Sequence, residues 1–213
     1  MADLLNEISE LMQRGKSKDV KALCQQAVDE GIPAVDILEK GLLAGMSVIG
    51  EKFKNNEIFV PEVLIAARAM SKGTEVLKPY LTEDEEAGKG TVILGTVQGD
   101  LHDIGKNLVR MMMEGKGLNV IDLGVDVSVE QFITAAKENN AEVIACSALL
   151  TTTMEEMGKI VKACEAEGIR DKVKIMIGGA PITQEYCDLI GADCFTVDAA
   201  SAADAAAALC AGE

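Results

Sequence analysis

The sequence predicts a helical bundle followed by an α/β domain with a doubly wound, five-stranded parallel sheet. Apolar residues recur at helical spacing up to about residue 81, and residues 82–90 contain no apolar side chain larger than alanine. From residue 91 onward, short apolar runs alternate with amphipathic stretches. We therefore expect a helical domain (1–81), a linker (82–90) and an α/β domain (91–213).

Four helices are expected before the linker, which makes this half a small four-helix bundle. Ser17 can cap the second helix, and Gly31 can end it. Pro33 stands where the first turn of a third helix tolerates a missing N–H, and Pro61 opens the fourth.

Five strands are expected after the linker, because five apolar runs are separated by segments long enough for crossover helices. Ser128 and Gln131 have the spacing of a capping box at the start of one such helix. The pattern indicates a Rossmann-like, flavodoxin-like domain. The expected strands are Val92–Val97, Val120–Leu123, Val143–Cys146, Val173–Ile177 and Cys194–Val197.

The polar and glycine residues of this half gather at three strand ends. A sheet of this type commonly has the strand order 2-1-3-4-5 and binds ligands where the order reverses, so the ends of strands 1, 3 and 4 lie side by side. Residues 99–103 follow the first strand, Ser147 ends the third, and Gly178 and Gly179 end the fourth. One cleft would collect them.

Composition and charge exclude several classes of function. The net charge of −15 would repel a phosphate backbone, so nucleic acid is not an expected partner. No signal peptide or membrane span is visible, which favours a cytoplasmic protein that does not enter a membrane. The six cysteines form no CxxC pair and are interpreted as reduced core residues.

His102 is the only histidine, and it lies in a polar loop at the predicted ligand-binding edge. It could act as an acid, a base or a metal ligand. Zinc is disfavoured, because one histidine with Asp100 and Asp103 falls short of three or four ligands. A cofactor that brings its own metal needs only one axial donor. Asp100 could orient that donor, with Ser147 extending the hydrogen-bond chain, or could simply cap the following helix.

The other candidate motifs are weaker. Gly178 and Gly179 could let a ligand approach the backbone closely, or form an ordinary turn before Pro181. The first strand end lacks GxGxxG and GxxxxGK, so a nucleotide cofactor has no support. A nucleophilic pair of Cys146 and His102 is conceivable.

Three spaced elements together resemble the signature of cobalamin-binding domains. Asp100, His102 and Gly105 match its DxHxxG motif, Ser147 and Leu149 match SxL, and Gly178-Gly179 matches GG. The helical half, with the sequence FVPE at 59–62, resembles the cap domain of methionine synthase and of small corrinoid proteins. The likeness covers nearly the whole chain.

The resemblance implies a corrinoid protein of a methylamine, methanol, betaine or methoxy-aromatic methyltransferase system. Such a protein carries a methyl group on cobalt, cycling between methylcobalamin and Co(I), and is a component of the system rather than a complete enzyme. The implied partners are a substrate-specific methyltransferase, an acceptor methyltransferase acting on tetrahydrofolate or a thiol such as coenzyme M, and a reductive activator.

The resemblance also assigns roles to residues. His102 would coordinate cobalt from below, and Asp100 would accept its other imidazole N–H. The remaining positions expected to bind the cofactor are Gly105, Ser147, Leu149, Gly178 and Gly179, the last two flanking a slot for the nucleotide tail. Candidates to cover the upper face are Phe59, Val63, Leu64 and Met70, although each could equally belong to the bundle core.

Three alternatives share parts of the pattern. An adenosylcobalamin mutase small subunit would not need the helical cap, and a cobalamin-dependent sensor would be expected to carry a DNA-contact patch. A signalling receiver of the same topology would need a phosphorylatable aspartate in an acidic pocket. His102 and the helical half fit the receiver poorly.

Overall fold

The computed structural model describes residues 2–81 and 88–212 of the 213-residue chain. It divides into two compact units, one of Met1–Gly88 with Glu114–Gly117 and one of Lys89–Met113 with Leu118–Glu213. Most of the expected linker (82–90) lies outside the described residues. Each unit is described here by itself.

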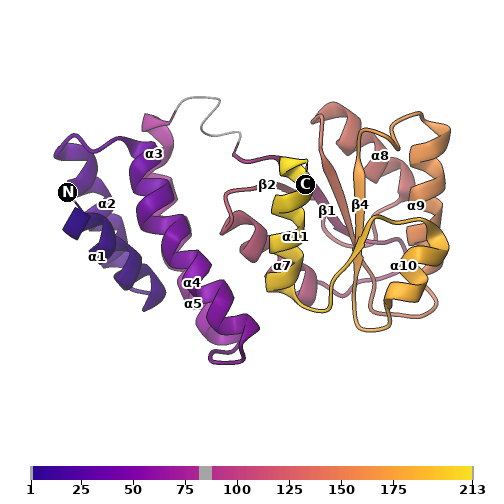
Figure 1. Cartoon of the computed structure of the whole chain (residues 1–213), viewed down its shortest axis with the longest axis horizontal. Coiled ribbons are helices and arrows are strands. Elements are labelled where there is room, and N and C mark those ends of the chain that lie inside the picture. The colour runs from indigo at the N-terminus through magenta and orange to yellow at the C-terminus, as the bar shows by residue number, and fades with distance from the viewer. Residues whose placement is uncertain (1, 82–87, 213) are drawn as a thin grey trace. The chain divides into compact units, whose positions relative to one another are not determined.

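The first unit is helical, as the sequence predicts (Figure 1). Its first two helices are α1 (Ala2–Gln13) and α2 (Ser17–Asp29). A third, continuous helix consists of α3 (Ala34–Asp36), a π-helical segment η1 (Ile37–Leu43) and α4 (Ala44–Lys54). The last helix is α5 (Val60–Leu77), extended by the 3₁₀ turn η2 (Lys78–Tyr80).

Close packing of the helices explains much of the sequence pattern in this unit. Ile8, Met12 and Val20 are fully buried. At Gly45 a Cβ atom would lie 2.5 Å from Cε of Met12, so α4 approaches α1 too closely for any side chain there. The small residue is required by the packing of these two helices.

The expected cap of α2 is wrong by one residue. Ser17 is the first helical residue, and Lys16 is the N-cap, without a side-chain capping bond. Gly15, at φ 68°, reverses the chain directly after α1. The carbonyl of Lys16 therefore already accepts the first helical bond, from the N–H of Val20.

The second unit contains the predicted five-stranded sheet, in the order β2-β1-β3-β4-β5 with all strands parallel. Thr96, Ser147 and Gly178 are register partners across β1, β3 and β4, so these strand ends meet at one edge. The strands are β1 (Thr91–Thr96), β2 (Asn119–Asp122), β3 (Val143–Ser147), β4 (Lys174–Gly178) and β5 (Cys194–Phe195).

The strand β5 is shorter than expected, because the chain turns at Thr196 toward the next helix, which Asp198 caps through the N–H of Ser201. The predicted capping box of Ser128 and Gln131 is confirmed by two hydrogen bonds of 2.9 and 3.3 Å. The capping-box residues therefore located the start of α8 correctly, whereas hydrophobicity alone placed the end of β5 too late.

Helices cover both faces of the sheet (Figure 1). The face toward α8 (Val129–Glu138), α9 (Glu155–Ala166) and α10 (Gln184–Ile190) holds a dense core, with Ile144, Ile175, Phe132 and Met157 fully buried. The opposite face lies under α7 (Ile104–Glu114) and α11 (Ala199–Ala211). Toward the ends of β3 and β4, the strand residues of that face include Ala145, Ser147 and Gly178, which have small side chains or none.

The six cysteines are all free thiols, as expected, but only four are buried in a core, whereas Cys194 and Cys210 are half-buried. Burial raises the pKa of Cys24 to about 12 and that of Cys164 to about 11. Within residues 2–81 and 88–212, no helix has the length and apolar character needed to cross a membrane. A cytoplasmic location stays a prediction.

Candidate functional site

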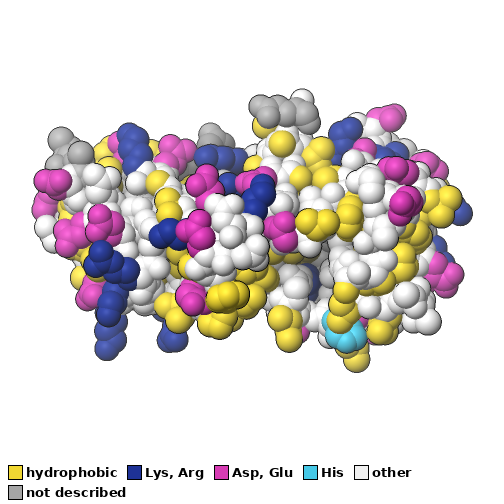
Figure 2. Space-filling view, turned by 60° about the horizontal axis from the view of Figure 1, so that its bottom comes forward, with side chains coloured by type: hydrophobic (Ala, Val, Ile, Leu, Met, Phe, Trp, Pro, Cys, Tyr) yellow, Lys and Arg dark blue, Asp and Glu magenta, His cyan; other side chains and the backbone are white. Residues whose placement is uncertain are grey.

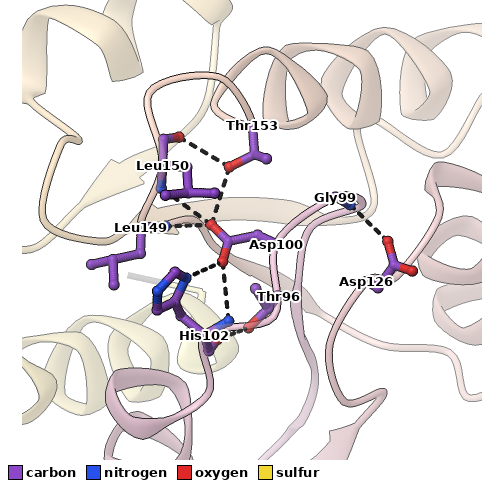
Figure 3. A network of polar contacts seen from close by, with 8 residues as sticks. All are labelled: Thr96, Gly99, Asp100, His102, Asp126, Leu149, Leu150 and Thr153. Atoms are coloured by element: carbon purple, nitrogen blue, oxygen red, sulfur yellow. Dashed lines mark hydrogen bonds and ion pairs between the residues drawn. The ribbon is translucent and has the colours of Figure 1, made fainter.

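A buried carboxylate organises the loop between β1 and α7. The side chain of Asp100 is 0% exposed and accepts hydrogen bonds on both oxygens (Figure 3). Oδ2 accepts from the backbone N–H groups of Leu149 at 2.7 Å and Leu150 at 3.2 Å and lies 3.1 Å from the Thr153 hydroxyl. Oδ1 accepts from the N–H of His102 at 3.0 Å. A loop some fifty residues later thus supplies most donors.

These donors decide the charge of Asp100. Burial by itself would raise its pKa, but the hydrogen bonds from Leu149, from His102 and from Thr153 outweigh burial and hold the pKa well below the usual range. Asp100 is therefore an anion at neutral pH, although no part of it reaches solvent.

The ring of His102 is attached to this anion. Its Nδ1 lies 2.6 Å from Oδ1 of Asp100, while the side chain as a whole is 52% exposed (Figures 2 and 3). Because an ionised carboxylate can only accept, Nδ1 carries the proton and the neutral ring keeps a lone pair on Nε2. The Thr96 hydroxyl also donates to the backbone carbonyl of His102 at 2.8 Å. The imidazole is therefore an oriented nitrogen donor.

The described residues contain no cluster of three or more His, Cys, Asp or Glu side chains that could hold a metal ion. A metal bound at His102 would therefore need to bring most of its ligands with it, as the metal of a macrocyclic cofactor does.

The hydroxyl group that contacts Asp100 belongs to Thr153 and not, as expected, to Ser147. The Thr153 hydroxyl is buried and has two acceptors in reach, Oδ2 of Asp100 at 3.1 Å and the Leu150 carbonyl at 3.0 Å. Ser147 ends β3 with its side chain on the α7 face, whereas the chain beyond it turns toward Asp100. The run of three threonines at 151–153 is the only signal in the sequence, and it does not say which threonine makes the contact.

A cavity of about 530 Å³ lies on the α7 and α11 face of the sheet. Four of the predicted cofactor-binding positions line it, namely Gly105, Ser147, Gly178 and Gly179. Its walls are mainly apolar, with contributions from β1, β3 and β4 below and from α7 and α11 above. Asp100, His102 and Leu149 belong to the hydrogen-bonded network instead.

The two adjacent glycines serve different purposes. Gly178 shares its face of β4 with Met176, and a Cβ added there would meet nothing closer than the Thr196 carbonyl at 3.8 Å. Its missing side chain leaves cavity space free. Gly179 has φ 134°, and a Cβ there would lie 1.8 Å from the carbonyl oxygen of Ala148. The backbone itself requires this glycine.

Lys106 is a site residue that sequence reasoning missed. It lines the cavity, is 2% exposed, and places Nζ 2.6 Å from both oxygens of Asp122 and 2.9 Å from Oδ1 of Asn107. Burial would raise the pKa of Asp122, but its contacts with Lys106, the N–H of Gly124 and Arg110 together outweigh burial and lower the pKa. Lysine is rarely buried, so its position in the sequence gave no indication of this pair.

The four upper-face candidates separate into two groups within the helical unit. Val63 is 0% and Met70 is 7% exposed, so both pack in the core of that unit. Phe59 is 67% and Leu64 is 42% exposed. Of the four, only this second pair presents a large apolar surface.

Comparison with known proteins identifies the family. Residues 90–210 match a family model described as a B12 binding domain, and residues 4–78 match a second model with the same description. The chain belongs to the B12-binding corrinoid proteins. The cobalamin cofactor, the corrinoid-protein assignment and the two-part fold that the motifs predicted are thereby confirmed.

Relatives of this corrinoid protein include proteins from the genus Methanosarcina. The dimethylamine corrinoid protein of Methanosarcina barkeri is 43% identical over 201 residues, covering 94% of each chain. Trimethylamine corrinoid protein 1 of Methanosarcina acetivorans is 45% identical over 175 residues, covering 81% of each. A solved methanol:cobalamin methyltransferase complex of Methanosarcina barkeri contains a chain with 31% identity and a TM-score of 0.90, and the match covers 99% of this chain and 81% of that one.

The residues present fit a corrinoid. The site offers one exposed and oriented imidazole nitrogen, together with a large, mainly apolar cavity that a side chain at Gly178 would partly fill. An axial donor and a space for a long substituent are what such a macrocycle requires from a protein that supplies no other metal ligand.

Proposed function

We propose that this protein carries a methyl group between a methyltransferase that demethylates a methylated amine and a second methyltransferase that acts on tetrahydrofolate or a thiol. A reductive activator would return oxidised cofactor to the cycle. The donor class is supported by relatives at 43% and 45% identity that are named for dimethylamine and trimethylamine, against 31% for the chain of the methanol complex.

In this proposal Nε2 of His102 is the axial ligand. One observation carries this proposal. His102 Nδ1 lies 2.6 Å from a completely buried carboxylate, while the His102 side chain itself is half exposed. When bound, the cobalt of the corrinoid supplies the chemistry of accepting and releasing the methyl group. The chain contributes the ligand, its orientation and its basicity.

Asp100 controls the donor strength of the ring. An ionised acceptor on Nδ1 increases electron density at Nε2 and fixes the direction of its lone pair.

The cavity beside β3 and β4 would hold the nucleotide tail of the cofactor. Its apolar lining suits a planar base, and Gly178 leaves room for the tail to pass the strand end. Ser147 would line the path of the tail rather than contact Asp100.

The helical unit would cover the other face of the cofactor, and residues 91–213 would hold it from below. Phe59 and Leu64 are the candidates for this contact, because their side chains are exposed in the helical unit while Val63 and Met70 are not. Access by two methyltransferases would require this cover to move aside.

The axial assignment is tested by electron paramagnetic resonance of the Co(II) form. The protein is loaded with cobalamin after growth on ¹⁵N-histidine, and a second sample carries unlabelled protein with ¹⁵N-benzimidazole cofactor. We expect the nitrogen hyperfine pattern to change with the labelled histidine only. A change with the labelled benzimidazole would reject His102 as the ligand. His102→Ala protein is the control for a spectrum without histidine coordination.

The donor class is tested separately with purified methyltransferases. The loaded protein should be methylated from dimethylamine or trimethylamine in the presence of the matching methyltransferase and more slowly from methanol with its own. Faster methylation from methanol would reject the amine assignment while leaving the cofactor site unaffected.

A further inference from the structure

The loop that carries Asp100 and His102 is held from a second side by Asp126. Oδ1 of Asp126 accepts a hydrogen bond from the N–H of Gly99 at 2.7 Å (Figure 3). The backbone N–H of Asp126 donates to the carbonyl oxygen of Asp100 at 3.0 Å. One residue therefore bonds to the backbone of two consecutive residues, Gly99 and Asp100, in the segment that leads to His102.

Asp126 adopts an unusual backbone conformation to make these bonds. Its φ is 54°, in the left-handed region that non-glycine residues generally avoid. Aspartate and asparagine tolerate this region better than other residues, and strained residues that persist are held by their surroundings. Gly99, its partner, also has a positive φ of 82°.

The segment that carries Asp126 is itself fixed to the sheet. Beyond β2, the carbonyl of Gly124 accepts from the N–H of Thr96 at 3.0 Å, and the N–H of Val127 donates to the carbonyl of Thr96 at 3.0 Å. Val127 is 2% exposed and belongs to the core. The backbone on both sides of Asp126 is therefore bonded to β1, although the Asp126 side chain itself is exposed.

Asp100 is consequently fixed at both of its ends. Its carboxylate is bonded to the loop after β3, and its backbone carbonyl is bonded to the loop after β2. The Asp100 N–H also donates to the Val97 carbonyl at 3.1 Å. The bond from Asp126 adds a restraint at the Asp100 carbonyl, from which the chain continues to His102.

We propose that Asp126 is a positioning residue for the axial histidine, acting through the backbone of Gly99 and Asp100. The inference rests on the proposed role of His102 as the cobalt ligand. Asp126 does not touch the cofactor in this scheme. It sets the loop conformation in which the His102 ring meets both the Asp100 carboxylate and the metal.

The test uses full-length protein and two substitutions that separate side chain from backbone. Asp126→Gly keeps the positive φ accessible and removes the acceptor, whereas Asp126→Asn keeps an acceptor oxygen in a residue that tolerates this conformation. Asn140→Gly is the matched control, because Asn140 is another exposed residue with a positive φ (46°), in the loop after α8. Melting temperatures of all three verify that the fold is kept.

Three measurements follow. In the protein without cofactor, amide hydrogen exchange at Gly99 should accelerate about tenfold in Asp126→Gly, since its N–H loses its acceptor. With cobinamide, which lacks the tail and so isolates the axial bond, the Kd should rise about fivefold in Asp126→Gly. The fraction of Co(II) that shows histidine coupling should fall in parallel. Asp126→Asn and Asn140→Gly should match the wild type in all three.

Either of two results overturns the proposal. Unchanged amide exchange at Gly99 in Asp126→Gly would mean that the bonds from Asp126 do not hold the loop that carries Asp100 and His102. Faster exchange with unchanged cobinamide affinity and unchanged histidine coupling would make Asp126 a purely local turn residue. Failure of the proposed role of His102 would look different, because the wild-type protein itself would then lack histidine coupling on cobalt. Amide exchange at Gly99 would still report whether Asp126 holds the loop.

Discussion

Nδ1 of His102 and Oδ1 of Asp100 are 2.6 Å apart, and they join a half-exposed ring to a carboxylate that is 0% exposed. The burial of one partner and the exposure of the other define what each does. In the proposed function the ring would contact the cofactor, and the carboxylate keeps its charge because the protein, rather than water, solvates it.

Replacing Asp100 should destabilise the protein in a pH-dependent way. Asp100→Asn removes the charge that Leu149, Leu150 and Thr153 solvate, which should cost about 2 kcal/mol at pH 7. The folded-state pKa is depressed below the unfolded value of about 3.9, so this stabilisation is present above about pH 5 and is lost as the pH falls through the folded pKa. Urea unfolding of both proteins between pH 3 and 7 measures it.

The difference between wild type and Asp100→Asn should therefore be constant near neutrality and shrink in acid. A difference that grew as the pH fell would contradict an ionised, stabilised Asp100. Asp103→Asn is the matched control, since Asp103 is an exposed aspartate in the same loop.

Loss of the hydroxyl group should change the acid dependence of stability at Thr153 but not at Ser147. Thr153→Val removes a donor from Asp100, so it should cost about 1 kcal/mol and raise the pKa of Asp100 toward its usual range. Thr153→Ser should restore both. Ser147→Ala should leave the acid dependence of stability unchanged and affect only cofactor affinity. An equal acid response in Ser147→Ala and Thr153→Val would place Ser147 in the network after all.

The adjacent glycines give a second pair of contrasting variants. Gly178→Leu should keep the fold and weaken binding of cobalamin at least about tenfold, with little effect on tail-less cobinamide, because its side chain enters the cavity. Gly179→Leu should instead lower the melting temperature strongly, since the Cβ alone meets the Ala148 carbonyl. Isothermal titration and thermal unfolding distinguish the two. A stable Gly179→Leu protein would contradict the described backbone.

The α/β unit should bind cobalamin without the helices. It contains its own core, which includes Phe132 and Ile144, together with all the residues proposed to contact the cofactor from below. A fragment beginning near Gly90 should keep histidine coordination, whereas its Co(I) form should oxidise faster and methyl transfer should slow. Spectra of the fragment and of the full-length protein, recorded side by side under air-limited conditions, provide the comparison. Equal Co(I) lifetime and transfer rate in a soluble fragment would reject the covering role of the helices.

Periodicity and the DxHxxG motif were sufficient for the fold and for the placement of His102. Apolar runs gave the five strands because a buried parallel strand must be apolar on both faces, and this composition is local in the sequence. The order of the strands followed from the general rule for doubly wound sheets. That order alone brought residues near positions 100, 147 and 178 to one edge.

The hydrogen-bond partners of Asp100 could not be obtained in this way. Leu149 and Leu150 contribute backbone N–H groups, which no side-chain pattern reveals, and Thr153 is one of three consecutive threonines. The role of Asp126 depends on a positive φ and on a contact 27 residues away. Lys106 was missed for a related reason, because its burial on α7 depends on a partner in the strand β2, Asp122.

The separation in sequence of the residues around Asp100 also has a kinetic consequence. The bonds from Leu149 and Thr153 span 49 and 53 residues and join the loops that follow β1 and β3, so they close a long segment of chain. We expect them to form after the folding transition state, with a φ-value near zero for Thr153→Val. Whatever tightens them, including a ligand on His102, should slow unfolding and leave the rate of folding nearly unchanged.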